Sequence, residues 1–244
     1  MQVDALAVRL RPRTTMEAAD LGVRVCQAAA RSVYPAYLAV ALPVMVLAIA
    51  SYDLAPWLPS VAIWCAKPWL DRTILFALSR AVFNQPTRPA DVWRAGRQVW
   101  WRQLLFTWTV QRLSFWRSLT QPIYQLEGGS TWSARRRVRQ LRRGAVGAAF
   151  LTTEAFCFAE LALLTGLVSL LFWFAPAGRG PDAYELFFGG APALAALAIP
   201  IAYALVVLFL EPFYVAAGFA LYLNRRAELE AWDIEQEFRH AFGK

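Results

Sequence analysis

Four charged side chains, Lys67, Asp71, Arg72 and Glu160, stand inside long apolar runs and are the residues best suited to chemistry. A charge in such a setting is costly, and it often marks an ion or proton pathway or a structural salt bridge. With a rise of about 1.5 Å per residue, Arg72 and Glu160 reach a similar depth in the two apolar runs. We therefore predict that these two pair, with Lys67 and Asp71 as neighbours four residues apart on one helical face. Two roles are left open for these charges. They can form a salt-bridged pin, meaning a salt bridge that only holds the helices together, or they can belong to a transport or proton pathway.

A second set of polar residues is expected near the membrane boundary. Glu211 precedes Pro212, and we predict that it is an interfacial acid near Arg225. The alternative is a hinge acid that lines a cavity. Glu154 is predicted to lie at the cytoplasmic edge of its helix.

An arginine run at 133–143 is predicted to contact lipid headgroups or a protein partner. The basic residues of the run are Arg135, Arg136, Arg137, Arg139, Arg142 and Arg143. Glu154 is expected to face Arg142 or Arg143. Such runs can also bind nucleic acid or act as an electrostatic lipid sensor. We favour a positive-inside determinant that lies on anionic headgroups, and we expect no nucleic-acid partner.

Familiar catalytic and metal-binding patterns are missing from the sequence. His240 is the only histidine, so a histidine-based metal site or a Ser-His arrangement lacks its parts. Cys26, Cys65 and Cys157 have no paired spacing and are predicted to be buried thiols outside disulfides. We expect no cofactor and no enzymatic activity, although a membrane enzyme is kept as a third possibility.

Composition indicates that lipid is the solvent. The chain is 58% hydrophobic and 17% charged, whereas soluble domains carry roughly a quarter charged residues. We predict an all-α, polytopic integral membrane protein with about four transmembrane helices plus interfacial amphipathic helices, in one membrane domain over 1–244. Its predicted segments are a cytoplasmic N-terminal segment (1–32), span one (33–51), span two (60–83), a cytoplasmic or interfacial Arg/Trp-rich segment (84–144), span three (145–174), span four with a bend near Pro212 (191–224) and a cytoplasmic amphipathic tail (225–244).

Span two is the disputed one, because Pro68 and three charges make a re-entrant segment a fair alternative. Arginine distribution favours a full crossing: residues 1–32 hold five arginines and 84–144 hold twelve, while 52–59 holds none and 175–190 only Arg179. Loops rich in arginine stay cytoplasmic. The prediction is a multi-pass protein of the bacterial inner membrane with both termini in the cytoplasm. Because residues 1–32 lack the apolar core of a secretory signal, the first apolar run is expected to be a retained anchor.

The C-terminal stretch 227–242 is amphipathic and contains five acids. An acidic polar face argues against anionic lipid as its partner and favours protein, including the arginine-rich segment of the same chain.

Three strings resemble a family of uncharacterised bacterial polytopic membrane proteins: RPRTTMEAADLG at 11–22, QPIYQLEGG at 121–129 and EPFYVAAGFALYLNRRAELEAWDIEQEFR at 211–239. Members of that family tend to be encoded near a MoxR-type AAA+ ATPase, von Willebrand A-type proteins and a membrane transglutaminase-like protein. The resemblance implies a non-enzymatic accessory or scaffold subunit of an envelope-associated system, with a cytoplasmic partner such as the AAA+ ATPase. It also suggests that the segment from Glu211 to Arg239, with Arg225 and Arg226, acts as one elbow between membrane and cytoplasm. A small transporter or ion-coupled carrier that uses the intramembrane charges is the alternative.

Overall fold

The computed structural model describes residues 13–101, 116–127, 131–174 and 193–230, and every regular element within them is helical. The all-α prediction is therefore confirmed for this part of the chain. In order, the elements are α1 (Thr15–Ala28), α2 (Ala30–Ala50), η2 (Ser51–Asp53), α3 (Leu58–Ala81), α4 (Pro89–Arg94), η3 (Arg97–Trp101), α6 (Arg117–Leu126), α7 (Thr131–Arg142), α8 (Val146–Trp173) and α10 (Ala193–Glu230).

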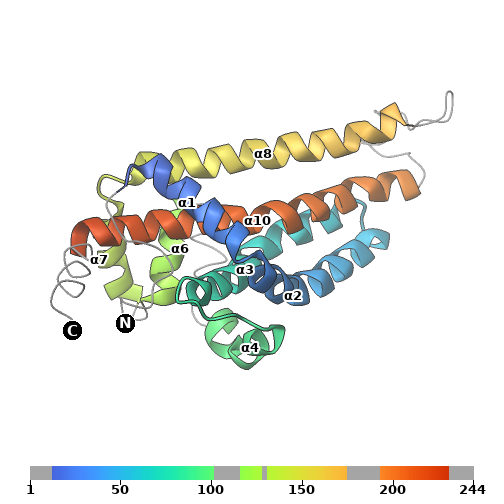
Figure 1. The fold of residues 1–244 in the computed structure, drawn as a ribbon. Helices are drawn as coiled ribbons and strands as arrows, with labels where there is room; N and C mark the ends of the chain where they lie inside the picture. The colour runs from blue at the N-terminus through green and yellow to red at the C-terminus, as the bar shows by residue number, and fades with distance from the viewer. Residues whose placement is uncertain (1–12, 102–115, 128–130, 175–192, 231–244) are drawn as a thin grey trace.

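Four long helices, α2, α3, α8 and α10, form the body of the molecule (Figure 1). The short turn around η2 joins α2 to α3, and these two helices pack side by side. Helix α3 also packs against α10, so it lies inside the bundle and buries residues along most of its length. This central position lets α3 carry charged side chains, because protein groups surround them on all sides.

Helix α8 is apolar on all faces yet is scarcely packed. Only 11% of its apolar window is buried, and large side chains such as Phe158, Leu161 and Trp173 are exposed. A helix that is apolar all round is normally buried in a protein core or in a membrane. Because protein covers so little of α8, its surface requires lipid or another apolar partner.

Within the described ranges, three helices are long and apolar enough to span a membrane: Ala30–Asp53, Val146–Leu170 and Ala196–Leu229. This is consistent with a membrane protein. Helix α3 has 24 residues, about 36 Å at the usual rise, but its charges keep it out of this group. The predicted fourth span stays a prediction.

Close backbone approaches fix how α10 packs. A Cβ on Gly22 of α1 would lie 2.3 Å from the carbonyl oxygen of Ala216, and one on Gly218 would lie 2.3 Å from that of Ser118 in α6. Both distances are shorter than any real Cβ contact, so these glycines allow α1 and α6 to touch the backbone of α10.

The element boundaries refine the predictions in two places. Helix α10 continues unbroken through Pro212 to Glu230, so the described part of the predicted tail belongs to the same helix. Within the segment 84–144, α6 does not lie on the surface: residues 118–124 are all buried, and α6 packs against both α8 and α10. The predicted segments 1–12, 102–115, 175–192 and 231–244 lie outside the described residues.

Candidate functional site

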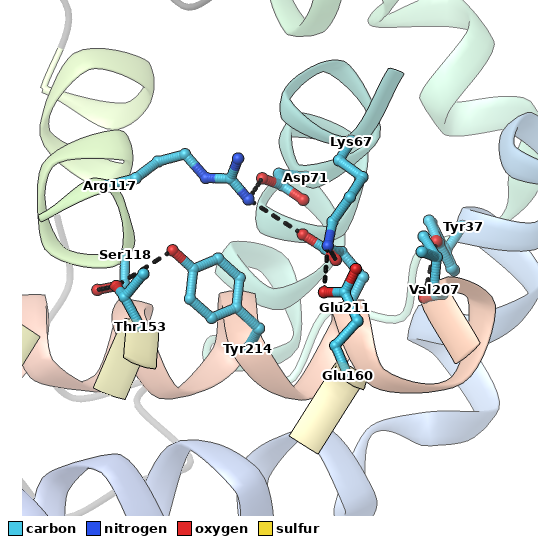
Figure 2. Close-up of polar contacts among 10 residues, drawn as sticks. All are labelled: Tyr37, Lys67, Asp71, Arg117, Ser118, Thr153, Glu160, Val207, Glu211 and Tyr214. Carbon is cyan, nitrogen blue, oxygen red and sulfur yellow. Dashed lines mark hydrogen bonds and ion pairs between the residues drawn. The ribbon is translucent and has the colours of Figure 1, made fainter. Parts of the chain in front are cut away.

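Three long helices meet at one ammonium group in the middle of the bundle. The Nζ of Lys67 lies 2.6 Å from Oε2 of Glu160 and 2.9 Å from Oε2 of Glu211. The Lys67 side chain is 10% exposed and that of Glu211 is 3% exposed. A buried ion costs several kcal/mol to desolvate, so short contacts to two carboxylates are needed to hold Lys67 there. This one residue thus connects α3 to α8 and to α10 (Figure 2).

A second cation, Arg117, enters from the short helix α6. Its Nη2 lies 3.0 Å from Oδ2 of Asp71 and 3.2 Å from Oε1 of Glu211. The guanidinium also lies 5.3 Å from the centre of the Tyr214 ring, a cation–π contact. Glu211 therefore bridges the two cations, and we call Lys67, Asp71, Arg117, Glu160 and Glu211 the ion network.

Hydroxyl groups surround the ion network. The Tyr214 and Thr153 hydroxyls are 3.5 Å apart, and Ser118 lies 3.5 Å from Thr153 (Figure 2). On the other side, the Tyr37 hydroxyl donates to the carbonyl of Val207 at 3.4 Å. These contacts extend the polar interior from α8 to α2.

The ion network contains two cations and three carboxylates, and therefore carries one negative charge in excess when all five groups are ionised. Asp71 is fully buried, and neither of its oxygens receives a well-aligned hydrogen bond. The Asp71 and Glu211 carboxyls both contact the same nitrogen, Nη2 of Arg117, at 3.0 and 3.2 Å. One proton between these two carboxyls, or one small cation, would restore neutrality.

A cavity of about 430 Å³ opens beside the ion network between α3, α8 and α10. Its polar wall includes Lys67, Arg117, Glu160 and Glu211, and Glu154 lies on the same wall. Apolar side chains of α3, α8 and α10 complete the lining. The cavity has room for a small polar or charged species next to these charged groups.

The predicted pairing of Arg72 with Glu160 is wrong. Glu160 contacts Lys67, whereas the Nε of Arg72 donates to the carbonyl oxygen of Val99. Arg72 points toward η3, away from α8. Lys67, five residues before Arg72, is the residue of α3 that reaches α8.

The residues that were expected at the membrane boundary also lie elsewhere than predicted. Glu211 lies in the ion network rather than near Arg225, whose Nη1 is 2.6 Å from Oε2 of Glu228. Pro212 follows it inside continuous helix. Arg226 lies 3.8 Å from Glu127. Glu154 forms no ion pair with any residue in the described ranges.

The arginines of α7 and the turn after it divide into two groups. Exposed members are Arg135, Arg136, Arg139 and Arg143. Arg137 instead pairs with Glu127 at 3.0 Å, and the guanidinium of Arg142 lies 4.2 Å from the Trp116 ring.

Arg117 is the functional candidate that sequence reasoning missed. It was counted among twelve interfacial arginines, and the charges at 67, 71, 72 and 160 already balanced one another. The available signal was its position at the start of the weakly polar stretch RSLTQPIYQL, where it is the only charged residue. Such a stretch can pack inside a bundle.

The thiols show no sign of a reactive centre. Cys26 is buried, and burial raises the pKa of its thiol to about 12, which keeps it protonated. Cys65 is half-buried, and Cys157, predicted to be buried, is exposed on α8. Among the described residues, no group of histidine, cysteine and acidic side chains could hold a metal ion.

No protein family model, curated protein or solved structure shows a match to this chain.

Lys67 and Glu160 should be energetically coupled. Lys67→Met leaves Glu160 without its cation and leaves Glu211 with Arg117 alone. It is expected to lower the free energy of unfolding by about 3–5 kcal/mol. Adding Glu160→Gln should cost about 1–3 kcal/mol less than the sum of the two single effects. The measurement is unfolding of the purified protein in mixed detergent micelles.

The matched control pairs Arg72→Met with Glu160→Gln. These effects should add within about 0.5 kcal/mol, because the two side chains do not meet. Additivity for Lys67 and Glu160 would exclude their direct contact.

Proposed function

We propose that this chain is a four-span protein of the bacterial inner membrane with both termini in the cytoplasm. Helices α2, α3, α8 and α10 are the spans. Support comes from the apolar, barely packed surface of α8 and from the three helices of membrane-spanning length. Helix α3 crosses as the fourth span, shielded by α2 and α10.

Charge distribution supports this orientation. The start of α1, the helices α6 and α7 and the C-terminal end of α10 all lie at one end of the molecule (Figure 1). The turn between α2 and α3, the end of α8 and the start of α10 lie at the other end. Arginines are concentrated in α7 and near the end of α10, whereas residues 52–59, around the turn between α2 and α3, hold none. The proposal therefore places the first end in the cytoplasm.

Cysteine accessibility tests this topology. In a variant with all three native cysteines replaced by serine, Leu54→Cys should react with a membrane-impermeant maleimide in intact spheroplasts, since Leu54 is 81% exposed in the turn before α3. Arg139→Cys on α7 should react only after permeabilisation. Reaction of both sites from the same side would mean that α3 does not cross.

The chain acts, in this proposal, as a non-enzymatic accessory or scaffold subunit of an envelope-associated system. The observation that carries it is the row of exposed arginines on α7, Arg135, Arg136 and Arg139, at the cytoplasmic end. Exposed arginines such as Arg136 and Arg139 can contact an acidic protein surface. The resemblance of the C-terminal string suggests a MoxR-type AAA+ ATPase as that partner.

Charge reversal on α7 tests the scaffold role. The tagged chain, co-expressed with the MoxR-type ATPase of the same bacterium and extracted in mild detergent, should retain the ATPase. The triple variant Arg135→Glu, Arg136→Glu and Arg139→Glu should lose it at least tenfold, because like charges would then face each other.

Arg24→Glu is the control, since Arg24 is equally exposed but lies on α1. If the wild-type chain retains no ATPase, or if the triple variant retains as much, the scaffold role is wrong.

A small ion-coupled carrier is the second candidate, and the cavity beside the ion network favours it. A dry salt-bridged pin requires no open space, whereas this cavity of about 430 Å³ has five charged side chains in its wall. A polar cavity of that size holds water. The excess carboxylate then provides a site for one proton or one small cation.

Cys157 on α8 reports on this cavity, because it belongs to its lining. In membranes containing the Cys26→Ser, Cys65→Ser variant, a charged, water-soluble methanethiosulfonate should modify Cys157. The control replaces Cys157 by serine and Phe158 by cysteine, since residue 158 is exposed but lies outside the cavity and should stay unmodified. Equal protection of both positions would exclude a wet cavity and with it the carrier.

A further inference from the structure

A second cavity, of about 600 Å³, lies at the arginine-rich end of the bundle. It is bounded by the C-terminal ends of α3, α6 and α10 and by α7. Its cationic lining residues are Arg80, Arg137 and Arg226, and Glu127 is its acidic one. We call it the basic cavity, and among its lining residues the charge sum is three positive and one negative.

Glu127 holds two of the arginines in place. Its Oε2 is 3.0 Å from Nε of Arg137, and its Oε1 is 3.8 Å from Nε of Arg226. The Tyr222 hydroxyl donates to the same Oε1 at 2.9 Å. One carboxylate therefore holds two guanidinium groups beside the same space.

Arg80 approaches from the end of α3. Its Nη2 lies 3.9 Å from Oδ2 of Asp91, at the outer limit of an ion pair, and 3.4 Å from the carbonyl of Pro86. The Nε of Arg80 is buried and has no hydrogen-bond acceptor within the described ranges. A donor buried without an acceptor is unfavourable, so an oxyanion bound here would gain a hydrogen bond that the protein alone does not supply.

Three guanidinium groups around one space favour a phosphate group, because their planar N–H pairs match two oxygens of a phosphate. The basic cavity also has apolar walls formed by residues such as Phe83, Leu126 and Leu223. Free inorganic phosphate has no apolar atoms to pack against such walls, whereas a phospholipid places acyl or glycerol carbons against them. Basic pockets between helices at the cytoplasmic boundary bind anionic headgroups.

We propose that the basic cavity binds the phosphodiester headgroup of an anionic phospholipid of the phosphatidylglycerol type. The arginines contact the phosphate, and the apolar walls contact the lipid carbons next to it. This site requires the membrane location proposed above but neither the ATPase partner nor the carrier activity.

Native mass spectrometry of the full chain in mild detergent tests the site, with phosphatidylglycerol and phosphatidylcholine added in equal amounts. Phosphatidylglycerol should be retained at least tenfold more than phosphatidylcholine. Arg137→Gln should weaken its retention about tenfold, as expected for losing one charge-assisted hydrogen bond. Arg139→Gln removes the same charge from the exposed face of the same helix and should change nothing.

Glu127→Gln should increase lipid retention, a result that misfolding of the variant would not produce. It removes the acid that competes with the lipid for Arg137 and Arg226, so retention of phosphatidylglycerol should rise several-fold. Inorganic phosphate at millimolar concentration should not displace the lipid.

Three results would overturn the proposal. They are equal retention of the two lipids, equal loss in Arg137→Gln and Arg139→Gln, and full displacement by inorganic phosphate, which would indicate a simple anion site.

Discussion

The arrangement of the helices depends on the pairing of one buried cation, the ammonium group of Lys67, in the interior of the bundle. Lys67 needs carboxylates within about 3 Å, since an unpaired ammonium in such a place costs several kcal/mol. Glu160 and Glu211 supply them from α8 and α10, and this sets the depth at which those helices meet α3. For α8 the constraint is strongest, because apolar contacts bury so little of that helix. A directional ion pair specifies its position where general apolar packing does not.

The same requirement explains why α6 is inside the bundle. Glu211 and Asp71 together carry more negative charge than Lys67 can neutralise, and Arg117 provides the second cation. Helix α6 can reach them because Gly218 lets its backbone touch α10 at Ser118. A polar segment of ten residues thus occupies space that an apolar span would otherwise fill. The Tyr214 ring adds a cation–π contact that keeps the Arg117 guanidinium beside the two acids.

The long helices were predictable because each coincides with an apolar run of the required length. Span one was expected at 33–51 and α2 covers Ala30–Ala50, while span three was expected at 145–174 and α8 covers Val146–Trp173. The residues expected to form a polar cluster were chosen by depth along each helix. Depth, however, does not reveal which side of a helix faces which neighbour, and so Arg72 was paired with Glu160 in place of Lys67. Glu211 was misplaced because α10 extends 19 residues beyond it, which puts this acid mid-helix instead of at the boundary.

A pin and a proton site are not physically independent in this ion network. A purely structural pin is most stable when its charges cancel, yet three carboxylates meet two cations here. In a medium of low dielectric constant the uncancelled charge is unfavourable, so the folded state gains stability by holding one proton or small cation. Asp71 and Glu211, which lie together and share Arg117, are where that charge is best neutralised. Glu211 also lies on the cavity wall, so a neutralising ion held there would border the cavity. The charge excess that is unfavourable for the fold would then favour the ion site that the carrier proposal requires.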